Sequence, residues 1–196
     1  MTNERGGAAL RQGVTDAITA ATFEELAESG YARMSMDAVA RRAGVGKAAL
    51  YRRWDSKEAM LIDLIGQVVR THLPPIPNTG ALRADLRALF GTYRSQLTNR
   101  LVTRIGPGLL AAASERGALG LALQEEIAKP RRAAALTVLR AAIERGELSA
   151  AVDEELAMDL LMAPLAFRLL IMQGPASNAY LDRLSRSIEA ALRAAV

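Results

Sequence analysis

The sequence predicts an all-α protein, and three observations support this fold class. Alanine, leucine, arginine and glutamate, which favour helices, dominate the 196 residues, whereas aromatic residues make up only 4%. No stretch alternates apolar and polar residues with the period of two that marks a half-buried strand. Hydrophobic residues account for 51% of the chain, which is enough to bury a substantial core. We therefore expect a globular, helical protein.

Several helices are expected in an N-terminal domain over residues 10–72. Residues 1–9 are expected to form a disordered arm. The first helix then runs from about Leu10 to Ser29, because apolar residues recur at helical spacing and Gly30 stands where helices commonly end. Ser35 is a suitable N-cap for a second, short helix that ends at Gly44.

A tight glycine turn, Gly44-Val45-Gly46, leads into a third helix over 47–54. A fourth helix begins at Asp55 or Ser56 and continues to about Thr71. Three prolines between residues 74 and 77 then prevent any helix from continuing, so we place the domain boundary here.

Residues 73–196 are expected to form a C-terminal domain of four or five amphipathic helices. The apolar periodicity and the glycine and proline breaks predict helices over 80–101, after 106–108, over 119–145, over 153–172 and over 177–195.

Positive charge is concentrated in the segment from Arg33 to Lys57. This segment holds seven basic and two acidic residues, an excess of five positive charges. Since the whole chain has a net charge of +4, the other residues sum to −1. A local basic segment of this kind favours an anionic partner such as the DNA backbone.

Two short helices around a glycine turn are typical of a helix-turn-helix, whose second helix enters the major groove of DNA. Leu50 and Trp54 are four residues apart and share the face expected to pack on the core. The remaining faces carry groups suited to phosphate oxygens (Lys47, Tyr51, Arg53 and Lys57) and groups suited to base edges (Ala48, Ala49 and Arg52). Arg52 is the candidate for a guanine contact, because a guanidinium reaches two acceptors of one base.

The same segment resembles the DNA-binding signature of the TetR family of transcriptional regulators. The resemblance rests on residues 35–40, 43–47, 50–54 and 56–58, and it is strong over about 10–70. A weaker resemblance to a C-terminal class of the family continues through residues 130–132, 145–148 and 152–170.

The resemblance implies about nine helices, a homodimer formed by the last two helices of each chain, and a palindromic operator in double-stranded DNA. It further implies a ligand of the C-terminal domain that releases the DNA and thereby relieves repression. Because the chain has few aromatic residues, we expect this effector to be a small molecule that is apolar or of mixed polarity. By position, Ser35 joins Lys47, Tyr51 and Lys57 among the expected phosphate contacts. One position departs from the family pattern, because Gly46 stands where a hydroxyl residue commonly caps the recognition helix.

Two further sets of residues are candidates for ligand binding and for dimerisation, and both sets fit plain core packing as well. The candidate effector pocket consists of Phe90, Tyr93, Arg94, Leu97, Leu101, Ile105, Leu110, Leu123, Ile127, Leu161, Leu165 and Phe167. The candidate dimer interface consists of Leu160, Leu169, Met172, Tyr180, Leu184, Ile188 and Leu192.

Several other classes of protein have little support. The chain contains no cysteine, which excludes disulfides and thiolate metal sites, and its single histidine, His72, has no partner at a fixed spacing. We expect no catalytic residues, no metal and no cofactor. The apolar run Leu160–Met172 is too short to span a bilayer and contains Pro164 and Arg168, so we expect a cytoplasmic protein without a membrane segment.

Four alternatives to a ligand-responsive repressor stay open. The first is a helical assembly protein whose basic patch is incidental, and gel filtration with and without DNA separates that model from a regulator. The second is an activator, and the third is a regulator without a small-molecule ligand. An all-α enzyme is a remote alternative, because the sequence offers no nucleophile and base at a recognisable spacing.

Overall fold

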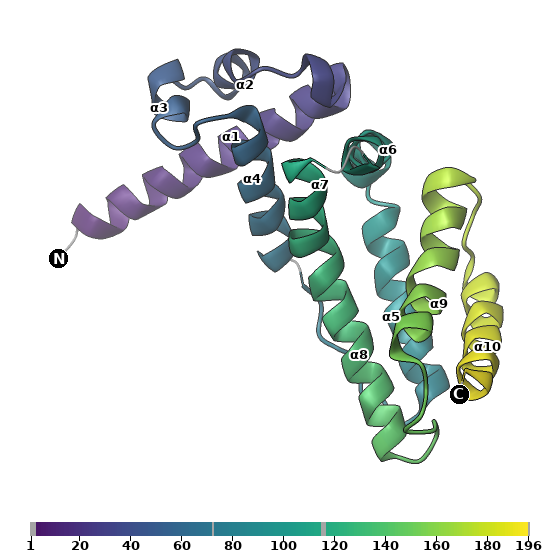
Figure 1. The fold of residues 1–196 in the computed structure, drawn as a ribbon. Coiled ribbons are helices and arrows are strands. Elements are labelled where there is room, and N and C mark those ends of the chain that lie inside the picture. The colour runs from purple at the N-terminus through teal and green to yellow at the C-terminus, as the bar shows by residue number, and fades with distance from the viewer. Residues whose placement is uncertain (1–2, 72, 115–116, 196) are drawn as a thin grey trace. The chain divides into compact units, whose positions relative to one another are not determined.

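The computed structural model describes residues 3–71, 73–114 and 117–195, and all regular secondary structure in these ranges is helical (Figure 1). The predicted all-α fold class is therefore confirmed. The elements are α1 (Asn3–Arg33), α2 (Met36–Ala43), α3 (Lys47–Tyr51), α4 (Lys57–Thr71), α5 (Leu82–Leu97), α6 (Arg100–Ser114), α7 (Ala118–Leu123), the π-helical η1 (Gln124–Ala128), α8 (Lys129–Glu144), α9 (Glu154–Ala166), the π-helical η2 (Phe167–Ile171) and α10 (Asn178–Ala194).

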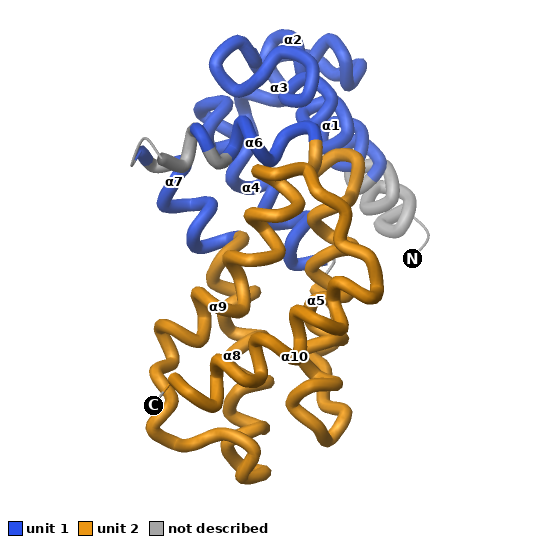
Figure 2. Tube along the Cα trace, turned by 90° about the vertical axis from the view of Figure 1, so that its right-hand side faces the viewer, with its two compact units in different colours: residues 1–71, 104–126 blue, residues 72–103, 127–196 orange. Residues whose placement is uncertain are grey.

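Contacts within the chain divide it into two compact units (Figure 2). The described residues of Met1–Thr71 and Arg104–Glu126 form unit 1, and those of His72–Thr103 and Ile127–Val196 form unit 2. The first division falls beside residue 72, where the prolines led us to place the domain boundary. Residues 104–126 were expected in the C-terminal domain. They pack within unit 1 and not with the other helices of the C-terminal part.

Helix α1 begins at Asn3, so residues 3–9 are helical and the expectation of a disordered arm is wrong for them. Residues 1–2 lie outside the described residues. Extending an existing helix adds one hydrogen bond per residue without a new nucleation cost, which explains how the helix continues to this point. At the other end Gly30 has φ 73° and ψ 162°, so the regular helix breaks at the glycine, as expected, and resumes for a short stretch to Arg33.

The core of unit 1 lies where α1 and α4 meet the two short helices between them. Ile18 and Leu26 of α1 and Leu61 and Leu64 of α4 are at most 4% exposed. Thr22 is buried among them and satisfies its hydroxyl by donating a hydrogen bond to the Ile18 carbonyl. Figure 1 shows α2 and α3 following one another alongside α1, and α2 contacts both neighbours.

One lysine ties the end of α1 to the start of α4. The Nζ atom of Lys57 donates hydrogen bonds to the carbonyls of Tyr31 (2.8 Å), Ala32 (3.1 Å) and Met34 (3.2 Å). It also lies 4.6 Å from the centroid of the Tyr31 ring. An ammonium group satisfies the carbonyls that a helix end leaves without partners, and its charge complements the negative end of the helix dipole.

Residues 104–126 join unit 1 through α7 and the adjoining π-helical turn. Helix α7 contacts α4. The carboxylate of Glu126 pairs with the Arg70 guanidinium and covers Gly66, where a Cβ atom would lie 2.3 Å from Glu126 Oε2. A side chain at residue 66 would therefore require the ends of the Glu126 and Arg70 side chains to move.

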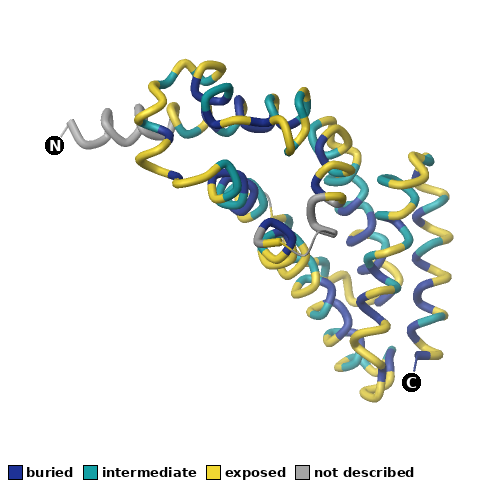
Figure 3. Tube along the Cα trace, turned by 45° about the horizontal axis from the view of Figure 1, so that its top comes forward, coloured by how far each residue is buried: buried dark blue, intermediate teal, exposed yellow. Residues whose placement is uncertain are grey.

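The core of unit 2 is formed by α5, α8, α9 and α10, which run side by side in Figures 1 and 2. Figure 3 marks the buried positions along these helices. The buried side chains that pack together include Leu82, Leu86, Phe90, Leu139, Leu161, Leu165 and Leu181. Among the described residues, no helix is both long and apolar enough to cross a membrane.

A buried carboxylate organises the end of unit 2 at which α5 begins. Asp85 is fully buried, and its Oδ1 atom accepts hydrogen bonds from the amide (2.6 Å) and the hydroxyl (2.7 Å) of Thr79. Its Oδ2 atom accepts a hydrogen bond from Arg145 Nη2 (3.1 Å). Glu147 accepts from the Leu82 amide and from Arg145, and these bonds lower the pKa of its carboxyl group.

We predict that Lys57→Gln lowers the free energy of unfolding of unit 1 by about 1–3 kcal/mol, because three backbone carbonyls lose a charged donor. Lys47→Gln is the matched control, since Lys47 is 65% exposed and its pairing with Asp37 contributes about 1 kcal/mol or less. Urea unfolding followed by the fluorescence of the single tryptophan, Trp54, measures unit 1 directly. Equal losses in the two variants would contradict the capping role.

We predict that Asp85→Asn destabilises unit 2 by about 1–3 kcal/mol, because the amide places a donor against Arg145 and removes the buried charge that faces it. Asp182→Asn is the control, because Asp182 is 57% exposed in its pair with Arg87 and is expected to cost at most about 1 kcal/mol. Thermal unfolding followed by circular dichroism gives both values. A loss no larger than that of the control would show that the network is dispensable.

Candidate nucleic-acid interface

The first helix of the helix-turn-helix, α2, is closed at both ends by local contacts. Ser35 is extended (φ −133°, ψ 147°), and its hydroxyl oxygen accepts a hydrogen bond from the Ala38 amide, as expected of an N-cap. Gly44 has φ 67° and ψ 27°, and the Val45 amide returns to the Ala40 carbonyl at 3.0 Å. A left-handed residue at this position favours glycine, so the turn between the helices follows from local sequence.

The second helix, α3, begins after Gly46 and is shorter than expected. Gly46 is extended (φ −67°, ψ 139°) and supplies no side-chain cap, consistent with the missing hydroxyl at this position. The α-helix ends at Tyr51 and not at Trp54. Backbone hydrogen bonds from Arg53 and Trp54 to the Leu50 carbonyl nevertheless keep the chain coiled through residue 54.

Leu50 and Trp54 face the core of unit 1, as predicted. Leu50 is fully buried and Trp54 is 6% exposed. The indole Nε1 of Trp54 donates a hydrogen bond to Asp63 Oδ2 of α4 at 2.9 Å. These two anchors determine which face of α3 turns outward.

The outward face of α3 carries most of the residues expected to contact DNA. Lys47, Ala48, Tyr51 and Arg52 are exposed, and Ala49 is half-buried. The guanidinium of Arg52 forms no hydrogen bond or ion pair with any described residue, so it is available to a ligand. The two alanines leave the start of the helix without bulky side chains, so its backbone can approach base edges.

Three of the neighbouring cations have partners within unit 1. Lys47 pairs with Asp37 on α2. The Arg53 guanidinium lies 4.6 Å from the Trp54 ring centroid and donates to Thr15 Oγ1 of α1 at 3.2 Å. The three donors of Lys57 are occupied by carbonyls, so this side chain caps α1 and is not the open phosphate donor that the sequence led us to expect.

Arg42 is a further base whose role the sequence did not reveal. Its guanidinium pairs with Glu24, Glu25 and Glu28 of α1, and the hydrogen bond with Glu28 is the main cause that raises the pKa of Arg42 and lowers that of Glu28. The acidic cluster is visible in the sequence, but only the packing of α2 on α1 identifies its partner.

The structure disperses the residues expected to line an effector pocket. Phe90, Leu161 and Leu165 lie in the closed core of unit 2, because they pack at the centre of α5 and α9, and Leu97 packs at its edge. Arg94 is bound to the Ala176 carbonyl and to Asn178 Oδ1. The remaining members lie elsewhere: Ile105 and Leu123 are buried in unit 1, Leu101 and Ile127 are half-buried, and the side chain of Leu110 lies outside the described residues.

Phe167 is 57% exposed, so its assignment to a pocket is wrong. It begins the π-helical turn η2, which interrupts the 3.6-residue periodicity from which the inner face was inferred.

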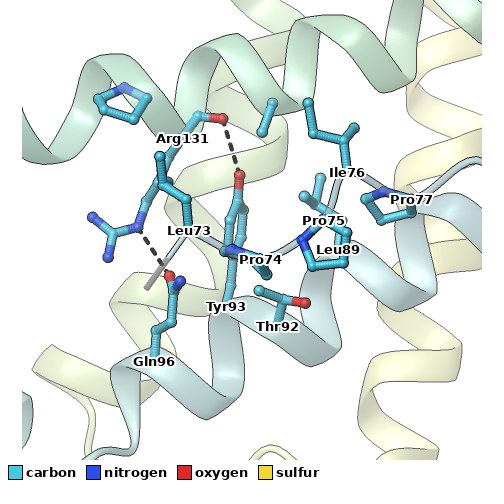
Figure 4. Close-up of a pocket in the computed structure, with 12 residues that line it drawn as sticks. Leu73, Pro74, Pro75, Ile76, Pro77, Leu89, Thr92, Tyr93, Gln96 and Arg131 are labelled. Atoms are coloured by element: carbon cyan, nitrogen blue, oxygen red, sulfur yellow. Dashed lines mark hydrogen bonds between the residues drawn. The ribbon is translucent and has the colours of Figure 1, made fainter. Parts of the chain in front are cut away.

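Of that set, only Tyr93 lines a pocket in unit 2 that Figure 4 shows. This pocket lies between the segment 73–77, α5 and α8, and Arg131 and Gln96 lie at one side of it. The prolines of this segment predicted only a domain boundary, so its place at a pocket was not expected. The apolar residues Leu73 and Ile76 among those prolines are the pattern that could have indicated a covering segment.

The candidate dimer residues fall into two groups. Met172 is 63% exposed, and Leu160, Leu169, Tyr180 and Leu184 pack on the edge of the core with part of their surface open. Ile188 and Leu192 are 5% and 1% exposed, because this side of α10 packs inside the protomer. Their assignment to a subunit interface is therefore wrong.

Metal-ligating side chains do not gather in the part of the chain that the structure describes. No three of its histidine, cysteine, aspartate and glutamate residues are placed to hold a metal ion together. His72 lies outside the described residues.

Two family models match the chain. The model described as bacterial regulatory proteins, tetR family, matches residues 18–64. The model described as tetracyclin repressor-like, C-terminal domain, matches residues 76–188, which is more than half of the chain.

Curated relatives agree along most of the length. A DNA-binding transcriptional repressor TetR of Mycobacteroides abscessus is 32% identical over 168 residues, which cover 86% of this chain and 87% of the relative. An HTH-type transcriptional regulator of Bacillus subtilis is 31% identical over 177 residues, which cover 88% of this chain and 86% of the relative.

Solved structures share the fold. A TetR family transcription regulator is 32% identical and has a TM-score of 0.68, covering 90% of this chain and 97% of its own. The FadR regulator of Bacillus subtilis, solved in complex with stearoyl-CoA, has a TM-score of 0.67 at 22% identity, covering 92% and 98%, and at this identity the likeness concerns the fold alone. Together with the helix-turn-helix geometry, these matches establish that the chain belongs to the TetR family of DNA-binding transcriptional regulators.

Proposed function

We propose that this regulator is a cytoplasmic, ligand-responsive repressor that binds a palindromic operator as a homodimer. The observation that carries the proposal is the exposed face of α3, where Arg52 has no partner among the described residues and stands beside two small residues. That face combines a group able to bind a guanine with a backbone able to approach the bases.

The proposed contacts divide into two kinds. Ala48, Ala49 and Arg52 face base edges and select the sequence, whereas Ser35, Lys47, Tyr51 and Arg53 bind phosphates and set the register. Ser35 accepts a hydrogen bond as an N-cap, and its hydroxyl proton is still available for a phosphate oxygen. Lys47 and Arg53 must exchange or share their present partners when they bind DNA.

The proposed dimer uses an apolar surface of unit 2 formed by Phe167, Ile171 and Met172, each at least 57% exposed. Leu160, Leu169, Tyr180 and Leu184 extend the candidate interface. Exposed apolar patches of this kind are typical of subunit interfaces. A two-fold dimer places two copies of α3 about one helical turn of DNA apart, or somewhat more, which requires a palindromic operator.

Repression and ligand response are supported by the relatives. The Mycobacteroides abscessus relative is named a repressor, and the FadR structure of shared fold was solved with stearoyl-CoA. A ligand that favours a protomer arrangement incompatible with DNA weakens operator binding, and by linkage DNA weakens ligand binding by the same factor.

We predict that Arg52→Ala weakens binding to the operator about 10- to 100-fold and reduces the preference for operator over unrelated duplex, because a base contact is lost. Arg132→Ala, which removes an exposed arginine of α8, is the matched control and leaves both quantities unchanged. Fluorescence anisotropy at several salt concentrations measures affinity and its salt dependence together. Binding without sequence preference in the wild type, or no complex with DNA, would refute the specific regulator and favour the assembly protein.

We predict that Ile171→Asp converts the dimer to monomers at micromolar concentration, because a carboxylate would have to be buried in an apolar interface. Leu121→Asp is the control, since Leu121 is an equally exposed apolar residue (63%, against 59% for Ile171) but lies on α7 in unit 1. Sedimentation velocity gives the oligomeric state of both variants. A dimer that persists in Ile171→Asp places the interface elsewhere.

A further inference from the structure

The pocket of unit 2 is covered by an extended segment, residues 73–77, which we call the strap. In the described part of the chain, no backbone hydrogen bond joins the strap to a helix, and three of its five residues are prolines without an N–H group. The first polar anchor after it is Thr79, bound to Asp85. The strap therefore lies over α5 and α8 through apolar contact, and lifting it breaks few hydrogen bonds.

The strap lines the pocket with apolar groups (Figure 4). Leu73 and Ile76 stand at the pocket but are still 47% and 44% exposed, so their burial is incomplete in this state. Leu89 of α5 and Ala134 of α8 complete the apolar walls. An apolar body placed here would cover strap surface that is now open to water.

A guanidinium without a counter-ion lies at the side of this apolar pocket. Arg131 is half-buried, and no acidic side chain among the described residues pairs with it. Its Nε atom donates to Gln96 Oε1 and its Nη1 atom to the Ile127 carbonyl, each at 3.2 Å. An arginine has five N–H donors, so three of them have no partner in the described structure. A charged side chain that is partly removed from water is normally paired with a group of opposite charge.

The neighbouring phenol does not supply the missing negative charge. Tyr93 donates its hydroxyl proton to the Arg131 carbonyl at 3.2 Å, as the dashed line in Figure 4 shows. Burial raises the pKa of Tyr93 to about 12, so the phenol is neutral at physiological pH. Burial also lowers the pKa of Arg131, which an anionic partner would reverse. The site therefore has one positive charge, apolar walls and no anion.

From this arrangement we propose that the pocket binds a small monocarboxylic acid with an apolar body, the carboxylate on Arg131 and the body beneath the strap. The inference rests on the ligand response proposed above and names the chemical class of the ligand. A planar carboxylate matches two N–H groups of one guanidinium. A phosphate group would bring a second negative charge into a site with a single cation and apolar walls, so it fits less well.

The test measures ligand binding to the full-length protein without DNA by isothermal titration calorimetry. Hexanoate and benzoate are the probes, and hexanamide and benzamide are their neutral analogues of nearly the same shape. We expect at least one carboxylate to bind in the micromolar to millimolar range, its amide to bind at least 10-fold more weakly, and inorganic phosphate not to bind.

Two neighbouring arginines of α8 provide matched variants. Arg131→Gln removes the cation of the pocket and is expected to weaken carboxylate binding about 10- to 100-fold. Arg132→Gln removes an exposed charge outside the pocket lining and should bind as the wild type does. The comparison of acid with amide uses the wild type alone, so the test holds even if a variant fails to fold.

The proposal is overturned if neither carboxylate binds, if the amides bind as well as the acids, or if Arg131→Gln and Arg132→Gln bind equally. Operator binding by the wild type, measured separately, then still stands as support for the proposed function. Carboxylate binding without any specific DNA complex would give the reverse result, a valid ligand site in a protein whose proposed function is wrong.

Discussion

The position of α2 and α3 depends on how the end of α1 is held. Lys57 binds the carbonyls of Tyr31, Ala32 and Met34, just after Gly30 has broken the regular helix, and Lys57 is itself the first residue of α4. This single ammonium therefore joins the helix before the helix-turn-helix to the helix after it. Helices α2 and α3 lie between these two points of the chain. Their movement relative to α1 and α4 is therefore restricted at both ends.

The positive charge that unit 1 exposes to solvent depends on how its basic side chains pack, and not only on their number. Arg42 is neutralised by three glutamates of α1, and Lys57 is occupied by backbone. Lys47, Arg52 and Arg53 are exposed at α3 and its end, whereas Arg33 and Arg41 are exposed at the end of α1 and on α2. The exposed positive charge of the segment therefore includes the face of α3 that presents Ala48 to the solvent, and attraction of this charge to phosphate would bring α3 close to DNA.

Unit 2 combines a closed core with one open polar feature. Its central leucines and Phe90 are buried against one another, and Asp85 is satisfied by Thr79 and Arg145. The buried carboxylates of unit 2, Asp85 and Glu189, pair with arginines, whereas the half-buried Arg131 has no partner of opposite charge among the described residues. The proposed carboxylate site follows from that difference, and the strap of residues 73–77 offers a covering segment that is held without backbone hydrogen bonds.

The sequence by itself determined the features that depend on neighbouring residues. The helical fold class, the caps at Ser35 and Gly44, the break at Gly30 and the inward face of Leu50 and Trp54 all follow from periodicity and backbone preference over a few residues. The helix-turn-helix was predictable for the same reason.

Only the tertiary structure decided which residues far apart in the sequence contact one another. Lys57 was expected on phosphate but lies on carbonyls 23–26 residues away, and Ile188 and Leu192 were expected at an interface but are buried inside the protomer. Phe167 is exposed because a π-helical turn interrupts the periodicity of its helix. An amphipathic pattern predicts that one face of a helix is buried. It does not predict which element covers that face, because the covering element depends on the packing of the whole chain.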